Sequence, residues 1–412
     1  QPVFALVSGL GSGNWAPVHR FCEAQALPCW FPSVGAVPPE VVQLRKAARA
    51  SLALSPSMAS VTRVRICVSE VTPEPLAAGL TRADVTSVTL AAGGLLGGGR
   101  GAARGGGIGS YWGNLRSIGE KVGMNGKTSG VVPFIRVMDS LTLAISQGSL
   151  RRGSAACYLD IFHPEIEEFL EIRKASGDFN RKSLNLHHGI SVSDAFMEAV
   201  REGAMFGLRS PKTNEVIREV DARSLWQKIL EIRLQTGEPY VIFSDTVNRA
   251  MPKHQRDLGL SVRQSNLCSE IMLHTGKDHL GEERTAVCCL SSVNAEKFLE
   301  WRDHPTFVED IMRFLDNVLQ DFITRAPVDM KNAVYAAIRE RSVGLGLMGF
   351  HSFLQSQGVA MESATAKAWN NVMFKHLRRG ADAASVKLAK ERGACPDAED
   401  CGVMARFSHK LA

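Results

Sequence analysis

Five consecutive residues, Asn266-Leu267-Cys268-Ser269-Glu270, place a carboxamide, a thiol and a carboxylate at alternate positions. Residues two apart in an extended or looped segment project to the same side, so these three groups are expected to face one substrate. A second thiol, Cys288, follows in the apolar run 285–290, which is typical of a buried strand. A thiol beside a general base, with another thiol that can supply electrons, suits radical reduction at a sugar.

Segments on either side of this motif alternate between strand-like and helix-like patterns. Apolar runs indicate strands at 156–161, 240–243 and 286–290, and apolar residues at helical spacing indicate helices at 225–233, 307–323 and 330–339. Pro164 begins a further helix, with Ile166, Phe169 and Leu170 at core spacing. This alternation predicts an α/β fold with mainly parallel strands.

Length and composition limit the class of protein. A chain of 412 residues is long enough for two or three domains, and its 45% hydrophobic and 22% charged content is ordinary for a globular protein. The net charge of +6 comes from interspersed residues, which suits anionic small molecules and equally a solvated surface. The chain has no apolar run of membrane-spanning length, and its nine cysteines include no CxxC pair. We therefore expect a cytoplasmic protein that binds neither membranes nor nucleic acids.

The first quarter of the chain differs from the rest. Residues 1–82 are expected to form a β-α-β-like segment, of which 1–35 resemble a piece of a bacterial solute-binding protein. Residues 83–106 are rich in Gly, Ala and Arg, which is typical of a linker. A phosphate-cradling role for these glycines is the alternative. The third predicted domain, 107–412, contains the thiol motifs.

Further motifs occur in a fixed order within that third domain. They are Gly107-Ile108-Gly109-Ser110, the segments 126–134, 146–153 and 163–174, and the glycine series 343–349. Together with the Cys268 motif, this series resembles the large (alpha, catalytic) subunit of ribonucleotide reductase, of the class I type. The resemblance implies a ten-stranded α/β barrel made of two five-stranded halves, with the Cys268 loop threaded through its centre. The barrel would be incomplete at its C-terminus.

The resemblance also implies roles for the residues of the two thiol motifs. Cys268 would carry a thiyl radical, Glu270 would be the general base for a ribose hydroxyl, and Asn266 would orient a hydroxyl. Cys288 would be one of two thiols that close to a disulfide as the sugar is reduced, and Cys289 would face the opposite side of its strand. The partner of Cys288 is expected upstream of Gly107. Residues 85–96 contain no cysteine, and the nearest upstream cysteine, Cys67, lies in a context that does not match.

Two further groups of residues match binding positions of the family. The substrate would be bound by Gly107, Gly109, Ser110 and Asn266. A specificity effector would be bound by Gln147, Arg151, Arg152 and Arg116, since arginine pairs bidentately with phosphate and stacks on bases. An ordinary basic turn is the alternative for the segment that contains Arg151.

The implied activity is reduction of ribonucleoside diphosphates to deoxyribonucleotides for DNA synthesis. No cofactor is expected to bind directly, since a separate metal-containing small subunit would supply the radical. The implied partners are dNTP and ATP effectors, thioredoxin or glutaredoxin as reductant, and a second copy in a homodimer. The alternatives are the class II enzyme, which uses adenosylcobalamin, and a catalytically inactive nucleotide-binding fragment. The chain ends before the family's diphosphate loop, paired tyrosines and cysteine-bearing tail, so by itself it is expected to be inactive.

Two patterns imitate other kinds of site. One of them has the glycine spacing of a dinucleotide fingerprint, Gly344-x-Gly346-x-x-Gly349, but we expect a packing strand and turn. The residues His274, Asp278, His279, Glu282 and Glu283 are metal-ligand types, yet they lie in a polar segment without helical ligand spacing. We expect a surface hairpin there. We interpret His187-His188 in the same way, as surface residues of a hairpin, and predict no metal site.

Overall fold

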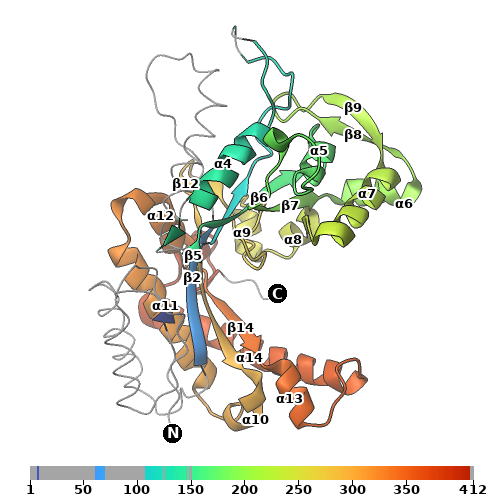
Figure 1. The fold of residues 1–412 in the computed structure, drawn as a ribbon. Helices are drawn as coiled ribbons and strands as arrows, with labels where there is room; N and C mark the ends of the chain where they lie inside the picture. The colour runs from blue at the N-terminus through green and yellow to red at the C-terminus, as the bar shows by residue number, and fades with distance from the viewer. Residues whose placement is uncertain are drawn as a thin grey trace. The chain divides into compact units, whose positions relative to one another are not determined.

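The computed structural model describes residues 7–8, 61–69, 107–122, 124, 126–144, 146–147 and 151–408. It has two compact units (Figure 1). Unit 1 comprises Gln1–Cys67, Pro252–Leu258 and Val287–Ala412, and unit 2 comprises Val68–Met251 and Gly259–Ala286. Both units combine helices with strands, so the predicted α/β class is confirmed. The predicted boundaries at 82 and 106 fall outside the described residues.

Unit 2 contains a four-stranded sheet in the order β10-β7-β6-β3. The strands are β3 (Gly107–Tyr111), β6 (Ser154–Asp160), β7 (His187–Val192) and β10 (Tyr240–Phe243). All neighbouring pairs are parallel, as predicted from the alternating pattern. Parallel neighbours need crossover connections, and helices between the strands supply them.

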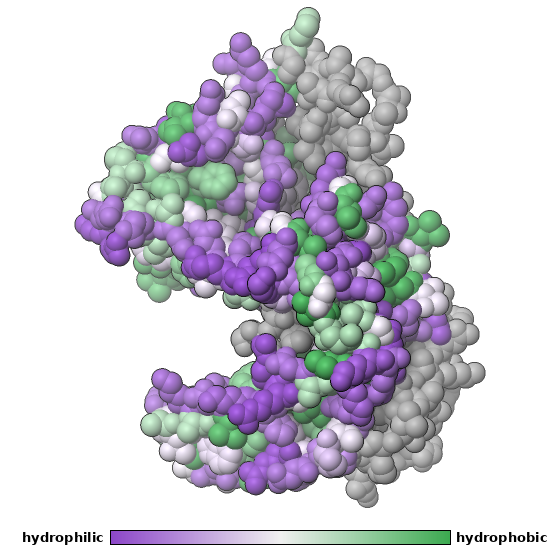
Figure 2. Space-filling view, turned by 180° about the vertical axis from the view of Figure 1, so that it is seen from behind, coloured by the Kyte–Doolittle hydropathy of each residue, from purple (hydrophilic) through white to green (hydrophobic). Residues whose placement is uncertain are grey.

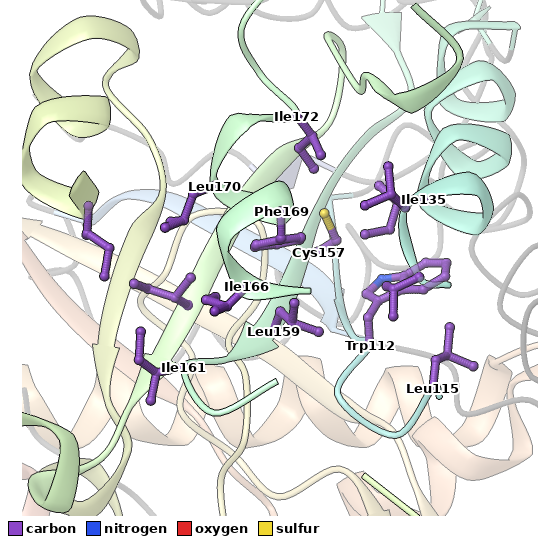
Figure 3. Close-up of a cluster of buried hydrophobic side chains, with 14 of the residues drawn as sticks. Trp112, Leu115, Ile135, Cys157, Leu159, Ile161, Ile166, Phe169, Leu170 and Ile172 are labelled. Atoms are coloured by element: carbon purple, nitrogen blue, oxygen red, sulfur yellow. The ribbon is translucent and has the colours of Figure 1, made fainter. Parts of the chain in front are cut away.

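Alternate residues of these strands face the helices of unit 2. Those helices are α4 (Val132–Ala144), α5 (Ile166–Glu171), α6 (Asp194–Glu202) and α7 (Ala222–Thr236). Cys157 and Leu159 of β6 pack with Ile135 of α4 and Phe169 of α5 in one buried cluster (Figure 3). The predicted helix at 225–233 lies within α7, and its Leu225, Ile229 and Ile232 join the same cluster.

The other face of the sheet carries a row of three tyrosines and one glycine. Tyr111, Tyr158, Gly189 and Tyr240 are in register across the four adjacent strands. Because side chains alternate along a strand, the odd and even positions of β6 separate completely between the two faces. The apolar core therefore lies on the face that the helices cover. The opposite face, which we call the tyrosine face, is covered by a loop.

Several smaller elements complete unit 2. They are the antiparallel pairs β4 (Ser146–Gln147) with β5 (Arg151–Arg152), β8 (Met205–Arg209) with β9 (Val216–Asp221), and β11 (Gly276–Lys277) with β12 (Glu283–Arg284), the helix α8 (Ser244–Arg249) and the 3-10 turn Phe179–Arg181. The interpretation of His187-His188 as a surface hairpin is wrong. Both residues lie on β7, where His188 is fully buried against Phe169 of α5, with ring centroids 5.4 Å apart.

Unit 1 is built around a second four-stranded sheet, in the order β1-β2-β13-β14. The strands are β1 (Val7–Ser8), β2 (Val61–Ser69), β13 (Ala286–Asn294) and β14 (Gly344–Met348). The pairs β1–β2 and β13–β14 are parallel. The helices are α9 (Lys253–Asp257), α10 (Phe298–Trp301), α11 (Phe307–Arg325), α12 (Lys331–Glu340), α13 (Phe350–Ser356), α14 (Ala364–Arg392) and α15 (Pro396–Glu399), with 3-10 turns at Ala295–Lys297 and Val328–Met330. The helices predicted at 307–323 and 330–339 are confirmed.

The glycine series that imitates a dinucleotide fingerprint forms β14 and the turn after it, as expected. A Cβ at Gly346 would lie 2.9 Å from Ser292 Oγ on the neighbouring strand. Gly349 has φ +74°, which favours glycine, and its Cβ position is 2.6 Å from Asn294 Oδ1. These glycines let β14 pack closely on β13.

One buried carboxylate organises the helices of unit 1. Asp316 of α11 has no exposed surface, and its oxygens lie 2.6 Å from both Arg341 Nη2 and Arg392 Nη1. Arg406 Nε lies 3.1 Å from the same carboxylate. Burial acts to raise the pKa of Asp316, but the charges of Arg341 and Arg406 outweigh it and lower the pKa. A single ionised acid thus joins α11 to α14 and to the last described segment.

The visible surface is mostly polar. Figure 2 shows hydrophilic residues over most of the described part of this face, with smaller apolar areas between them. Among the described residues, no helix is both long and apolar enough to cross a membrane.

Candidate active site

The segment that contains Cys268 runs across the tyrosine face of the unit 2 sheet. Ser191 Oγ on β7 donates a hydrogen bond to Arg263 O, at 2.6 Å. On β3, a Cβ at Gly109 would lie 1.8 Å from Ser265 O and 2.8 Å from Asn266 Cα. A Cβ at Gly107 would lie 3.0 Å from Leu267 Cδ2. The two glycines predicted to bind substrate therefore lie directly against the loop, which approaches too closely for a side chain at Gly109.

Asn266 and Glu270 are joined by a hydrogen bond. Asn266 Nδ2 donates to Glu270 Oε2 at 2.9 Å, and Asn266 Oδ1 accepts from Ile271 N at 3.1 Å. Asn266 is buried, whereas Glu270 and Cys268 are exposed. The spacing prediction is thus correct for the amide and the carboxylate. The amide of Asn266 is engaged in orienting Glu270, in addition to any contact with a substrate hydroxyl.

A tight turn presents the thiol of Cys268. Ser269 N donates to Asn266 O at 3.2 Å, and Ser269 has φ +68°, a left-handed conformation that is uncommon for serine. The Tyr158 hydroxyl on β6 contacts the turn on both sides of the thiol, at 3.0 Å from Asn266 O and 3.3 Å from Ser269 Oγ. Leu267 packs on the small cluster around Tyr158 and Ile242. The thiol therefore sits at the exposed tip of an anchored loop.

A buried acid supports the edge of the sheet beside Tyr240. Glu238 Oε1 lies 2.5 Å from His187 Nδ1, and Glu238 Oε2 lies 2.8 Å from His188 Nδ1. Burial acts to raise the pKa of Glu238, but the two imidazoles outweigh it and lower the pKa to about 2. The ring of His187 stacks on Tyr240, with centroids 6.0 Å apart and planes 8° from parallel. Burial raises the pKa of Tyr240, and the charges of Glu238 and Cys268 add to the effect.

A second acid lies on the same face at the end of β6. The Tyr111 hydroxyl donates to the Asp160 carboxylate, and the Arg263 guanidinium lies 5.6 Å from the centroid of the Tyr111 ring. Burial raises the pKa of Asp160 to about 6, although the Tyr111 hydrogen bond and the Arg263 charge oppose the change. Ser110, predicted to bind substrate, donates to Ala156 O at 3.1 Å and accepts from Trp112 Nε1 at 2.8 Å. The hydroxyl of Ser110 thus braces the strands under the loop.

Comparison with known proteins identifies the family. Residues 99–401 match the family model of the ribonucleotide reductase barrel domain. The chain belongs to the ribonucleotide reductase family. It is 43% identical over 311 residues to a protein of Frog virus 3 (isolate Goorha) described as a ribonucleoside-diphosphate reductase large subunit, covering 75% of this chain and 53% of that protein.

Two other relatives agree with the family. The ribonucleoside-diphosphate reductase large subunit of Invertebrate iridescent virus 3 is 38% identical over 340 residues, which cover 69% of this chain and 53% of the relative. Among solved structures, the Actinobacillus ureae class Id ribonucleotide reductase alpha subunit matches with a TM-score of 0.73 and 26% identity, covering all of this chain and 73% of that one. The chain spans about half the length of its viral relatives.

In this ribonucleotide reductase chain, Cys288 lies on β13 of unit 1 and is buried. Its neighbour Cys289 is also buried, and Cys289 Sγ lies 3.8 Å from Leu315 O of α11. Burial raises the pKa of Cys289 to about 12, and the charge of Asp316 adds to it. Cys289 therefore faces helix α11. The strand next to β13 in the sheet is β2, which contains Cys67.

Three of the four residues predicted to sense effectors lie on the antiparallel pair β4–β5. Gln147 of β4 is opposite Arg151 of β5, and Arg152 is opposite Ser146. Arg116 follows β3, and its Nε atom is buried with no hydrogen-bond partner among the described residues. Gln147 and Arg151 are therefore paired across two antiparallel strands, and their role in effector binding stays a prediction.

No group of three or more His, Cys, Asp or Glu side chains within the described ranges could hold a metal ion. The segment with His274 and Asp278 does form a hairpin, β11–β12, as predicted. Its description as a surface hairpin is wrong for these two residues, which are both buried. Asp278 pairs with the fully buried Arg284 at 2.8 Å, and His274 Nε2 contacts Lys277 O at 3.1 Å.

Sequence reasoning missed the residues that support the loop from below. Tyr158, Tyr240, Glu238 and Asp160 contact the loop or its neighbours, but none lies in the Cys268 motif. A signal was present in the alternation of β6, where Tyr158 and Asp160 interrupt a run of small and apolar residues.

Proposed function

We propose that the chain is the catalytic barrel of a class I ribonucleoside-diphosphate reductase large subunit. The observation that carries the proposal is the hydrogen bond between Asn266 and Glu270, at 2.9 Å, around the exposed thiol of Cys268. A class I alpha subunit among the similar structures favours this class over the cobalamin-dependent one. The product, a deoxyribonucleotide, would be used in DNA synthesis.

Each group in the loop has a distinct task in the proposed reaction. The sulfur radical of Cys268 takes a hydrogen atom from a ribose carbon and returns it at the end, since S–H and activated C–H bonds have comparable strengths. Glu270 accepts a proton from a neighbouring ribose hydroxyl, which helps the adjacent hydroxyl leave as water. Asn266 keeps the Glu270 carboxylate oriented. A separate metal-containing small subunit supplies the radical.

Two further thiols balance the electrons. The substrate loses a hydroxyl as water and gains a hydrogen, so two thiols must give up two electrons and close to a disulfide. Cys288 is one of them. We propose Cys67 as the other, because its strand β2 neighbours β13 in the unit 1 sheet. Thioredoxin or glutaredoxin would then reduce the disulfide.

Binding sites complete the proposal. The ribonucleoside diphosphate would lie near Gly107, Gly109 and Ser110, on the strand that meets the Cys268 loop. A dNTP or ATP effector would bind Gln147, Arg151, Arg152 and Arg116. The orphaned Arg116 Nε supports this assignment, because a buried donor without a partner calls for a ligand acceptor. The complete protein would form a cytoplasmic homodimer.

The test is deoxynucleotide formation by variants made in a protein that spans the full length of the relatives. Labelled nucleoside diphosphate, a class I small subunit and dithiothreitol are supplied. Cys268→Ser should abolish product, since an O–H bond is too strong for reversible hydrogen transfer. Glu270→Gln should slow turnover by roughly two to four orders of magnitude.

The matched control for that test is Cys401→Ser, a thiol near the surface of unit 1 that contacts His254 O. It should leave turnover unchanged. Product formation by Cys268→Ser at the wild-type rate would refute the radical role of this thiol.

A further inference from the structure

Tyr158 lies at the centre of the unit 2 sheet, directly beneath the Cys268 loop. It is fully buried on β6, in register with Tyr111 on one neighbouring strand and Gly189 on the other. A Cβ at Gly189 would lie 2.4 Å from Tyr158 Cε1, so the glycine makes room for the ring. Packing therefore fixes where the phenol points.

The hydroxyl of Tyr158 contacts the turn on both sides of the thiol. It donates to Asn266 O at 3.0 Å, and Ser269 Oγ is 3.3 Å away and able to donate to it. Burial raises the pKa of Tyr158, so the hydroxyl keeps its proton and remains a donor across the physiological range. Asn266 O also accepts from Ser269 N, at 3.2 Å, so both of its lone pairs are used.

The turn needs such support because of its backbone. Ser269 has φ +68°, and a non-glycine residue keeps this conformation only where surrounding contacts enforce it. The Tyr158 hydroxyl contacts the side chain of this residue and the carbonyl that its amide binds. The same Asn266 also binds Glu270. One phenol is thus connected to the turn that carries the thiol and to the residue that orients the carboxylate.

We propose that Tyr158 is a positioning residue, whose hydroxyl sets where the Cys268 thiol stands relative to the Glu270 carboxylate. The proposal rests on the proposed reductase function for its consequence in catalysis. A tyrosine that served only to fill the core would be replaced by phenylalanine without effect on the loop.

The first experiment measures hydrogen exchange in Tyr158→Phe, which keeps the ring and removes the hydroxyl. The amides of Ser269 and Ile271 bind Asn266, so they should exchange about tenfold faster, the change expected for one lost hydrogen bond. Exchange in β14 of unit 1 should not change. Tyr335→Phe, which removes a hydroxyl from α12, is the matched control and should leave the loop unaffected.

The second experiment is a rescue. Ser269→Gly removes the cost of a positive φ, so Tyr158→Phe combined with Ser269→Gly should bring exchange in the loop back toward the wild-type rate. In the assay with a small subunit, Tyr158→Phe should lower kcat by about ten- to a hundredfold and leave KM within about twofold, and the double variant should regain part of kcat.

The outcomes separate this proposal from the proposed function. Exchange does not depend on turnover. If a wild-type protein that spans the full length of the relatives is inactive with a small subunit, but its loop still loosens in Tyr158→Phe, the reductase assignment is refuted and the positioning role is supported. Unchanged exchange at Ser269 and Ile271 would overturn the positioning role. So would a rise in exchange throughout unit 2 that Ser269→Gly fails to reverse. If Tyr158→Phe does not fold, Ser269→Ala tests the same contact from the other side and should also speed exchange at Ile271.

Discussion

At the residue scale, the site depends on glycines, which have no side chain, as much as on its reactive side chains. Gly109 allows Ser265 and Asn266 to lie against β3, and Gly189 allows Tyr158 to stand beneath the turn. The loop can therefore lie this close to β3, and the Tyr158 ring can stand beneath it, only because neither glycine has a Cβ. Glycines at 107 and 109 resemble a binding motif in sequence, and in the structure they also have a steric role.

Gly109→Ala should destabilise unit 2 and displace the loop. The new Cβ would lie 1.8 Å from a backbone oxygen of Ser265, which cannot move without shifting the chain, so the cost should reach about 1–3 kcal/mol or more. Gly107→Ala is the matched control, because its nearest neighbour is the flexible Leu267 side chain at 3.0 Å. Urea unfolding measures both variants. Equal losses of stability would contradict this account of Gly109.

Asp160 should make stability depend on pH. Its pKa is raised from 3.8 to about 6, so between these values the folded chain keeps a proton that the unfolded chain releases. The unfolding free energy should therefore fall as pH rises from about 4 to about 6, by on the order of 1–3 kcal/mol. Asp160→Asn cannot titrate and should lack this decrease. The measurement is the difference between the two proteins in urea midpoint at pH 4.5 and pH 7.5, and parallel profiles would show that Asp160 ionises normally.

At the element scale, charge and alternation decide how helices and strands are joined. In unit 2, the even and odd residues of β6 separate the helix core from the loop. In unit 1, Asp316 joins α11 to Arg341, Arg392 and Arg406, from three different parts of the chain. All three guanidiniums share this one carboxylate as an ionic partner. Its loss therefore removes that partner from each of them.

Asp316→Asn should therefore destabilise unit 1 strongly. A neutral amide leaves buried guanidiniums without a compensating charge, which typically costs about 3–5 kcal/mol. Asp257→Asn is the matched control, since the Lys253–Asp257 pair on α9 is exposed and should contribute almost nothing. Thermal and urea unfolding test both. A small effect of Asp316→Asn would mean that the arginines find other partners.

At the scale of the whole molecule, the chain places its two thiol motifs in separate units. Cys268 belongs to unit 2, while Cys288 is on β13 of unit 1. In the unit 1 sheet, β13 lies between β2, from the first quarter of the sequence, and β14. The first quarter of the chain, which lies outside the third predicted domain, thus contributes strand β2 beside the strand that contains Cys288.

The proposal that Cys67 is the second reducing thiol, made because β2 neighbours β13, predicts a disulfide between Cys67 and Cys288 in the oxidised protein. Mass spectrometry of unreduced peptides after mild oxidation should find this pair, and Cys67→Ser should abolish it. Cys157, which lies on β6 of unit 2, and Cys289, whose sulfur contacts Leu315 O of α11, should stay reduced. A disulfide from Cys288 to any other cysteine would contradict the pairing.

Short spacings in the sequence are enough to predict the features that depend on local geometry. Strand and helix periods predicted the α/β class and the parallel strands. The alternate positions of Asn266, Cys268 and Glu270 predicted that the amide and the carboxylate lie on one side, since local geometry repeats wherever the pattern occurs. The same local reasoning misplaced His187-His188, whose burial depends on Phe169 and Glu238.

The residues beneath the loop, in contrast, are brought there by long-range contacts. The Tyr158 hydroxyl meets Asn266 across 108 residues of sequence, and Glu238 meets His187 across 51. Such pairs follow from strand order and register, which a periodic pattern does not contain. Five adjacent residues therefore supply the chemical groups of the Cys268 motif, and the sheet beneath them fixes the positions of those groups.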